Sequence, residues 1–166
     1  MYREFDAKRI LIISDTHGRL QNLKALMQRL QTPDLTIHCG DLEMGEEAVQ
    51  KVVGSPLVCV RGNMDYDGKL PAEQMIEIRG KKIWITHGNR YGVSGTPLII
   101  REEAIERGMD IVMFGHTHRP YLDTDKDITV LNPGSLSQPR QDNGRPSFMM
   151  MEIDDDGEVH YSLNYL

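Results

Sequence analysis

Short apolar runs of strand length alternate with helical patterns along the first part of the chain. In the helical patterns, apolar residues recur at three- and four-residue steps, which places them on one helix face. In chain order, the sequence predicts a strand at 10–13, a helix at 20–30 that ends before Pro33, a strand at 35–39, a helix around 48–53 and a strand at 57–60. This β-α-β-α-β order indicates a sheet with helices outside it.

The alternation continues and then gives way to strands alone. A favourable N-cap and first-turn pair, Thr96 and Pro97, is expected to begin a helix that reaches about Arg107. The expected strands around and after this helix lie at 82–86, 111–114, 128–131, 148–153 and 158–163, with a hairpin turn at 154–157. Residues 64–76, rich in Asp, Gly and Pro, stay unassigned, and whether they form a lid is left open. Because no linker or repeat divides the chain, residues 1–166 are expected to form a single domain.

The composition is that of an ordinary globular domain. The chain has 166 residues, 39% of them hydrophobic, and 19 Lys and Arg against 25 Asp and Glu give a net charge of -6. A chain of this size should bury roughly 70% of the surface that its unfolded form exposes, which suffices for a core. Its apolar runs do not exceed four residues, whereas a membrane span needs ~20, so an integral membrane protein is excluded.

Charge and cysteine content indicate the cellular compartment and exclude some classes of partner. The N-terminus mixes both charge signs, which is not the layout of a secretory signal, and we expect a cytoplasmic protein. Cys39 and Cys59 lie within apolar runs, so buried thiols fit better than a disulfide. The acidic balance and the lack of a basic cluster argue against bulk nucleic-acid binding and against an anionic membrane surface as partner.

Side chains suited to metal binding follow five of the expected strands. They are Asp15 and His17, Asp41, Asn63, His87, and His116 with His118. Each one alone has an ordinary interpretation as a turn residue or a helix cap. In open α/β sheets, however, ligands bind outside the carboxyl ends of the strands, so all seven are expected to converge. Neighbouring glycines are expected to let the backbone turn sharply there.

This donor set indicates the kind of ion. Four imidazoles, two carboxylates and one amide oxygen without a thiolate suit manganese, iron, cobalt, nickel or zinc. Seven ligands are too many for one tetrahedral ion, whereas two ions that share a bridging carboxylate would each receive four protein ligands. Two-metal sites hold their ions ~3.5–4 Å apart and act on phosphoryl oxygens. Two divalent ions would also outweigh the two carboxylates, so the site would attract a phosphate.

These motifs resemble a known family. Asp15-x-His17, Gly40-Asp41, Gly62-Asn63, His87 and Gly115-His116-Thr-His118, in this order, resemble the calcineurin-like metallophosphoesterases over nearly the whole chain. The short length and the Asn132-Pro-Gly-Ser135 turn resemble the small bacterial and archaeal phosphodiesterase branch, whose relatives include the retromer subunit Vps29. The resemblance implies an α/β fold, a four-layer α/β/β/α sandwich of two mixed sheets with the metals at the strand ends.

The resemblance also implies roles for the seven residues. It assigns Asp15, His17, Asp41 and His118 to one ion and Asp41, Asn63, His87 and His116 to the other. Asp41 would bridge the two ions, Asp41 and Asn63 would take part in catalysis, and a metal-bridging hydroxide would be the nucleophile. Manganese is the leading metal, with nickel, iron, cobalt or zinc as alternatives. The implied activity is hydrolysis of a small phosphodiester or nucleotide-type substrate, and homo-oligomerisation stays open.

One position departs from the family pattern. Many members carry Gly-Asn-His, and that histidine is thought to protonate the leaving group, but here Met64 follows Asn63. General acid catalysis contributes 10²–10⁴-fold, so activated esters should react better than alkyl monoesters. A phosphomonoesterase or nucleotidase, and a Vps29-like interaction scaffold with little catalysis, remain the alternatives. Asp65 either orients a ligand or a water molecule or is a plain turn residue. His38 is interpreted as a histidine that is packed or that supports a ligand, rather than as a ligand itself.

Overall fold

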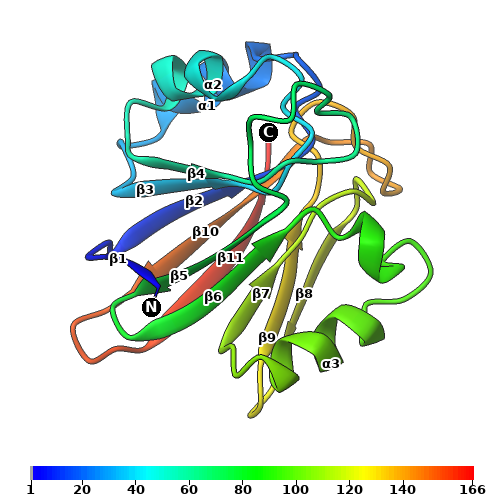
Figure 1. The fold of residues 1–166 in the computed structure, drawn as a ribbon. Coiled ribbons are helices and arrows are strands. Elements are labelled where there is room, and N and C mark those ends of the chain that lie inside the picture. Colours follow the sequence, from blue (N-terminus) through cyan, green and yellow to red (C-terminus); the bar gives the residue numbers. More distant parts are fainter. Residues whose placement is uncertain (1) are drawn as a thin grey trace.

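Two mixed β-sheets packed face to face form the centre of the molecule (Figure 1). The computed structural model describes residues 2–166. One sheet contains, in spatial order, β11 (Val159–Tyr165), β10 (Ser147–Ile153), β2 (Arg9–Ile13), β3 (Leu35–His38) and β4 (Leu57–Cys59). The other contains β1 (Arg3–Phe5), β5 (Glu73–Ile78), β6 (Lys81–Thr86), β7 (Ile111–Met113), β9 (Thr129–Pro133) and β8 (Pro120–Thr124).

Three helices cover the outer faces of the sheets. Helices α1 (Gln21–Arg29) and α2 (Glu46–Val53) lie on the five-stranded sheet, and α3 (Leu98–Glu106) lies on the six-stranded sheet (Figure 1). A short 3₁₀ helix, η1 (Asn89–Tyr91), follows β6. The layer order is therefore α/β/β/α, which confirms the fold expected from the sequence.

Strand β2 shows why four successive positions of its sequence are apolar. Ile10 and Ile12 pack into the core between the two sheets, whereas Leu11 and Ile13 pack beneath α1 and α2. All four side chains are fully buried. A strand that is covered on both faces needs apolar residues on both, and burial of each such side chain contributes roughly 1.5–3 kcal/mol. The same double burial fixes the register of the sheet, since a one-residue slip would exchange the two faces.

The parallel strands bring their carboxyl ends to one edge. Strands β2, β3 and β4 are parallel neighbours, with Ile13 opposite His38 and His38 opposite Cys59. In the other sheet β6 is parallel to β7, with Ile85 opposite Met113. The loops that leave these five strands therefore start at matched heights, and they carry the candidate ligands.

The predicted elements agree with the structure to within two residues at each end, but the prediction omits three strands and the 3₁₀ helix η1. Strands β1, β5 and β8 were not predicted, and β5 begins inside the segment that the sequence left unassigned. Helix α3 begins at Leu98, one residue later than expected, with Pro97 at the N-cap position. The Leu98 N–H donates to the Thr96 hydroxyl at 3.2 Å, so the threonine still supports the first turn.

Two predictions about the chain as a whole can be compared with the structure. Cys39 and Cys59 are both free and buried, and burial raises the pKa of each thiol, as expected for thiols in apolar runs. Within residues 2–166, no helix has the length and apolar character required to cross a membrane.

Candidate metal centre

The structure brings all seven candidate side chains into one cluster. The Nε2 atoms of His17 and His118 lie 3.0 Å apart, and His118 Nε2 lies 3.2 Å from Asp15 Oδ1. On the other side of the cluster, His87 Nε2 lies 3.2 Å from Asp41 Oδ2. His116 completes it, since its ring centroid is 5.2 Å from that of His87 and its Nδ1 lies 3.1 Å from Asn63 Oδ1. Residues up to 103 positions apart thus meet where the two sheets adjoin.

Within the cluster, ligand atoms form two overlapping groups. Asp15, His17 and His118 form one, and Asp15, Asp41 and His87 form the other, with the ligand atoms of each group within 4.8 Å of one another. Asp15 belongs to both groups. The carboxylate of Asp41 also faces both, because its Oδ2 lies 3.2 Å from His87 Nε2 and 3.7 Å from His17 Nε2. Two carboxylates therefore lie between the histidines.

In the carboxylates of Asp15 and Asp41, one oxygen accepts hydrogen bonds from outside the cluster and the other faces the histidines. Asp15 Oδ2 accepts hydrogen bonds from the Ser14 hydroxyl at 2.6 Å and from the His116 backbone N–H at 3.0 Å. Asp41 Oδ1 accepts one from the Met64 backbone N–H at 2.8 Å. The free oxygens, Asp15 Oδ1 and Asp41 Oδ2, are the ones that approach the histidines. Such outer hydrogen bonds orient ligands before an ion binds.

Three imidazoles are held in the same way. The Nδ1–H of His87 donates to the Cys39 carbonyl at 2.8 Å, and that of His118 donates to the Gln138 carbonyl at 2.7 Å. His17 Nδ1 lies 3.0 Å from a carboxylate oxygen of Glu43, to which it donates. These bonds fix the tautomer and turn each Nε2 toward the cluster.

Backbone strain is concentrated at the candidate ligands. Seven non-glycine residues among those described have positive φ, and five of them are candidate ligands: Asp15, His17, Asp41, His116 and His118. Non-glycine residues in this region are uncommon and cost about 1–3 kcal/mol each, so the rest of the fold must hold them there. The buried polar residues of the 132–137 turn contribute to this. Ser135 Oγ donates to the Asp15 carbonyl at 2.8 Å, and Asn132 Nδ2 donates to the Gly115 carbonyl at 3.0 Å.

The glycines beside the candidate ligands provide a positive φ, space for a neighbouring group, or both. Gly62 and Gly115 do not have positive φ, but a Cβ at position 62 would collide with the Asp41 carboxylate, and one at position 115 would lie 2.6 Å from Asp15 Oδ2. Gly40 combines both roles, with φ of 106° and a Cβ position only 2.6 Å from His87 Nδ1. The expectation of sharp turning therefore holds for Gly40, and also for Gly18 and Gly88, whose φ values are 72° and 99°, whereas close approach explains Gly62 and Gly115.

The titratable groups of the cluster shift one another's pKa values. Burial would raise the pKa of Asp15, but the adjacent His118 and His17 rings lower it below its usual range. Contact with Asp15 in turn raises the pKa of His17 to about 9, although burial opposes this. Burial would lower the pKa of His87, but the Asp41 carboxylate raises it. The mutual shifts come from opposite charges held together in a desolvated site.

The donor atoms fit a divalent ion. Asp15 Oδ1 and His87 Nε2 are buried and have no hydrogen-bond partner among the described residues. Leaving such atoms unsatisfied is costly, and a cation between them would satisfy both. Carboxylate, imidazole and amide donors together are the set that borderline divalent metals prefer.

Two residues outside the ligand set have defined places. His38 is fully buried, with Nε2 3.0 Å from the Thr16 hydroxyl and Nδ1 accepting from the Gly40 N–H. Burial lowers its pKa to about 3, so it is a packed, neutral histidine, as the sequence indicates. Asp65 accepts a hydrogen bond from the Asp41 backbone N–H at 2.8 Å, which makes it a positioning residue rather than a plain turn aspartate.

Comparison with known proteins identifies the family. A sequence profile of the calcineurin-like phosphoesterase superfamily domain matches residues 9–156. The chain belongs to the calcineurin-like phosphoesterase superfamily. This matched region contains all seven candidate ligands of the chain and confirms the resemblance seen in the sequence.

Among similar calcineurin-like phosphoesterases, two proteins come from Methanocaldococcus jannaschii. The probable metallophosphoesterase MJ0623 is 40% identical over 132 residues, covering 78% of this chain and 68% of the relative. The phosphodiesterase MJ0936 is 28% identical over 144 residues, covering 76% of this chain and 82% of the relative. These likenesses support a metal-dependent hydrolase of phosphoric esters.

Solved calcineurin-like structures share the whole fold. A predicted phosphoesterase from Streptococcus pneumoniae superposes with a TM-score of 0.78 at 26% identity, covering 98% of this chain and 99% of that chain. Vps29 from Entamoeba histolytica, in a complex with Zn²⁺, superposes with a TM-score of 0.75 at 25% identity, covering 95% and 98%. The likeness to Vps29 agrees with the branch that the sequence indicates.

Proposed function

We propose that this protein is a divalent-metal-dependent phosphodiesterase with a two-metal site. The observation that carries the proposal is the pair of overlapping ligand groups, which share a carboxylate and contain two buried atoms without hydrogen-bond partners. Two divalent ions bound there would supply positive charge to a phosphate and a water nucleophile near neutral pH. The seven side chains would hold these ions, and the protein would then need no nucleophile of its own.

The proposed ligands divide between two ions around Asp41. Asp15, His17, Asp41 and His118 would hold one ion, and Asp41, Asn63, His87 and His116 would hold the other. Asp41 Oδ2 lies within 4 Å of a histidine on each side, as does Asp15 Oδ1, so the choice of Asp41 as the bridge rests on the family resemblance. Manganese is the proposed metal, with nickel, iron, cobalt or zinc as alternatives that the same donor set suits.

The residue after Asn63 supports an ester with an activated leaving group as the substrate. Met64 cannot donate a proton, and its backbone N–H is already used to hold Asp41. An alkoxide leaving group would therefore depart slowly, whereas an activated ester would not depend on this missing acid. The relative MJ0936 is named a phosphodiesterase, which supports a diester as the substrate. Phosphomonoesters and nucleotides are the alternative substrates of the same site.

We propose that the protein is located in the cytoplasm. We also propose that residues 1–166 form a single domain, which contains the active site. The free, buried thiols of Cys39 and Cys59 support a reducing compartment. A small phosphodiester or nucleotide-type compound is the proposed substrate. The overall charge of -6 argues against binding of long nucleic acids.

The test compares bis-p-nitrophenyl phosphate with p-nitrophenyl phosphate as substrates of metal-stripped protein, before and after manganese is added. Hydrolysis that manganese restores, with the diester preferred, is the expected result, and Asn63→Ala serves as the blank. A preference for the monoester would overturn the diester assignment. Absence of turnover despite metal uptake would favour a Vps29-like interaction scaffold instead.

A further inference from the structure

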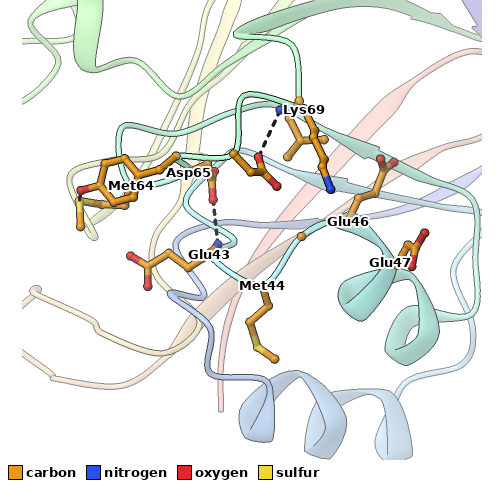
Figure 2. Close-up of a pocket in the computed structure, with 11 residues that line it drawn as sticks. Glu43, Met44, Glu46, Glu47, Met64, Asp65 and Lys69 are labelled. Atoms are coloured by element: carbon orange, nitrogen blue, oxygen red, sulfur yellow. Dashed lines mark hydrogen bonds between the residues drawn. The ribbon is translucent and has the colours of Figure 1, made fainter.

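A pocket of about 870 Å³ opens beside the metal centre. It lies between two segments. One is residues 43–47, which include the first two residues of α2, and the other is residues 64–70, which follow Asn63. Figure 2 shows Met64 and Asp65 on one side of this space and Glu46 and Glu47 on the other. Its volume falls in the range of pockets that bury small ligands.

The pocket is continuous with the groups that hold the ligands. Glu43, on its wall, accepts the hydrogen bond from His17. Met64 and Asp65, on the opposite wall, hold the side chain and the backbone of Asp41, respectively. A molecule whose phosphate reached the metal centre could place its next group in this pocket.

Apolar side chains are unusually exposed here. Met44 is 50% exposed, Met64 36% and Tyr66 81%, and all three line the pocket. The Tyr66 hydroxyl donates to the sulfur of Met64 at 3.3 Å, which joins the ring and the thioether into one surface. Thioethers and aromatic rings are adaptable surfaces for flat ring systems.

The charge of the pocket is strongly negative. Five carboxylates line it against one ammonium group, that of Lys69. Asp65 and Asp67 accept backbone hydrogen bonds, but neither Glu46 nor Glu47 has a hydrogen-bond or ion-pair partner among the described residues, and both are exposed. Charges of one sign around a cleft concentrate ligands of the opposite sign and repel like ones.

We propose that this pocket receives the leaving group of the diester and selects a flat ring that is uncharged or cationic. An aromatic alcohol such as a phenol that carries no phosphate has this chemistry, and its anion departs without the acid that Met64 does not supply. The phosphate would lie at the metal centre, the ring would lie against Met44, Met64 and Tyr66, and the carboxylates would reject leaving groups that carry additional phosphates. This inference rests on the proposed phosphodiesterase function, and it adds the class of substrate.

The kinetic test uses two methyl aryl phosphodiesters whose leaving phenols have similar acidity and opposite charge. One releases 4-(trimethylammonio)phenol and the other releases 4-sulfophenol. We expect kcat/KM of the manganese-loaded enzyme to favour the cationic phenol by about tenfold, and we expect added salt to weaken this preference. The double substitution Glu46→Gln, Glu47→Gln should reduce the preference several-fold.

A matched variant controls for the loss of two charges. Glu102 and Glu106 are exposed carboxylates on α3, far from the pocket in the fold, so Glu102→Gln, Glu106→Gln should keep the full preference. Equal preference in all three proteins, or no charge preference in the wild type, would overturn the proposal.

A binding test needs neither metal nor turnover. Metal-free protein labelled with ¹³C at the methionine methyl groups is titrated with 4-(trimethylammonio)phenol, and Met44→Leu and Met64→Leu assign the two signals. We expect these two signals to shift, and 4-sulfophenol to shift them much less. The spectrum also reports whether each variant is folded.

The two tests separate failure of this inference from failure of the proposed function. Shifted methionine signals without hydrolysis of either diester would contradict the phosphodiesterase function and leave the pocket as a binding site. Hydrolysis of both diesters with unshifted signals and no charge preference would contradict the pocket assignment alone.

Discussion

The carboxylate of Asp65 accepts a hydrogen bond from the backbone N–H of Asp41 at 2.8 Å. The same oxygen accepts one from the Gly62 N–H at 2.8 Å, and the second oxygen accepts one from the Glu43 N–H at 2.8 Å. A single side chain thus joins the loop after β3 to the loop after β4. Since Asp41 stands at positive φ, this bond helps to hold a strained ligand in place.

Asp65→Asn should weaken metal binding while leaving the fold intact. An amide can accept on its oxygen only, so its NH₂ group would face at least one of the three N–H donors. Loss of such an outer contact typically lowers metal affinity 10–100-fold, and we expect this range in a manganese titration. Asp67→Asn, which removes a nearby exposed carboxylate, is the control and should bind manganese normally. Normal affinity in Asp65→Asn would show that this bond does not position Asp41.

Gly62→Ala should disturb the centre although it replaces no ligand residue. The added Cβ would occupy the space of the Asp41 carboxylate, so that carboxylate must move. We expect at least a tenfold loss of metal affinity and about 1–3 kcal/mol of destabilisation, measured by urea unfolding. Gly95→Ala is the matched control, because its Cβ would lie 3.6 Å from the nearest atom and its φ is not positive. Equal behaviour of the two variants would contradict the close-approach explanation.

Metal uptake should depend on pH through His17. Contact with Asp15 raises its pKa to about 9 in the metal-free protein, so near pH 7 an incoming ion must displace a proton. Manganese affinity should therefore rise with pH toward about 9, and binding near pH 7 should release protons. Calorimetry in buffers of different ionisation enthalpy measures this release. His160→Ala, an exposed histidine in β11, should not change it, and pH-independent binding by the wild type would refute the role of His17.

The raised pKa of His17 should also make the stability of the metal-free protein depend on pH. A pKa raised from 6.5 to about 9 adds stability that is fully present below pH 6.5 and is lost as the pH rises through 9. The urea midpoint of metal-free protein should therefore fall across this range. In His17→Gln the decrease should be smaller, and an unchanged decrease would assign it to another group.

Much of the fold could be predicted from the sequence because burial on both faces gives strands an unmistakable pattern. Strand β2 is apolar at four successive positions, and α1 places Leu23 and Leu26 on one buried face. Two of the three omitted strands, β1 and β8, lack such a signal. Strand β1 is largely exposed, and β8 is exposed along most of its length, so neither needs apolar residues at regular spacing. Edge position in the sheet, rather than local sequence, makes them strands.

The convergence of the seven candidate ligands could be predicted because parallel strands deliver their loops to one edge. The hydrogen bonds, backbone conformations and packing that hold those ligands in place could not be predicted. The carbonyls of Cys39 and Gln138 hold two histidines, and a carbonyl has no signature in the sequence. The positive φ of Asp15 and Asp41 depends on tertiary contacts, and the space beside Gly62 depends on where Asp41 lies. Asp65 carried a signal only through its place next to the Asn63 loop.

The most direct test of the two-metal proposal is the manganese stoichiometry of the folded protein, measured by elemental analysis after equilibrium dialysis. The proposal predicts two ions per chain for the wild type and for His160→Ala, and fewer than one for Asp41→Ala, because the bridge serves both ions. Two ions retained by Asp41→Ala would contradict the bridging role. One ion or none in the wild type would contradict the two-metal site itself.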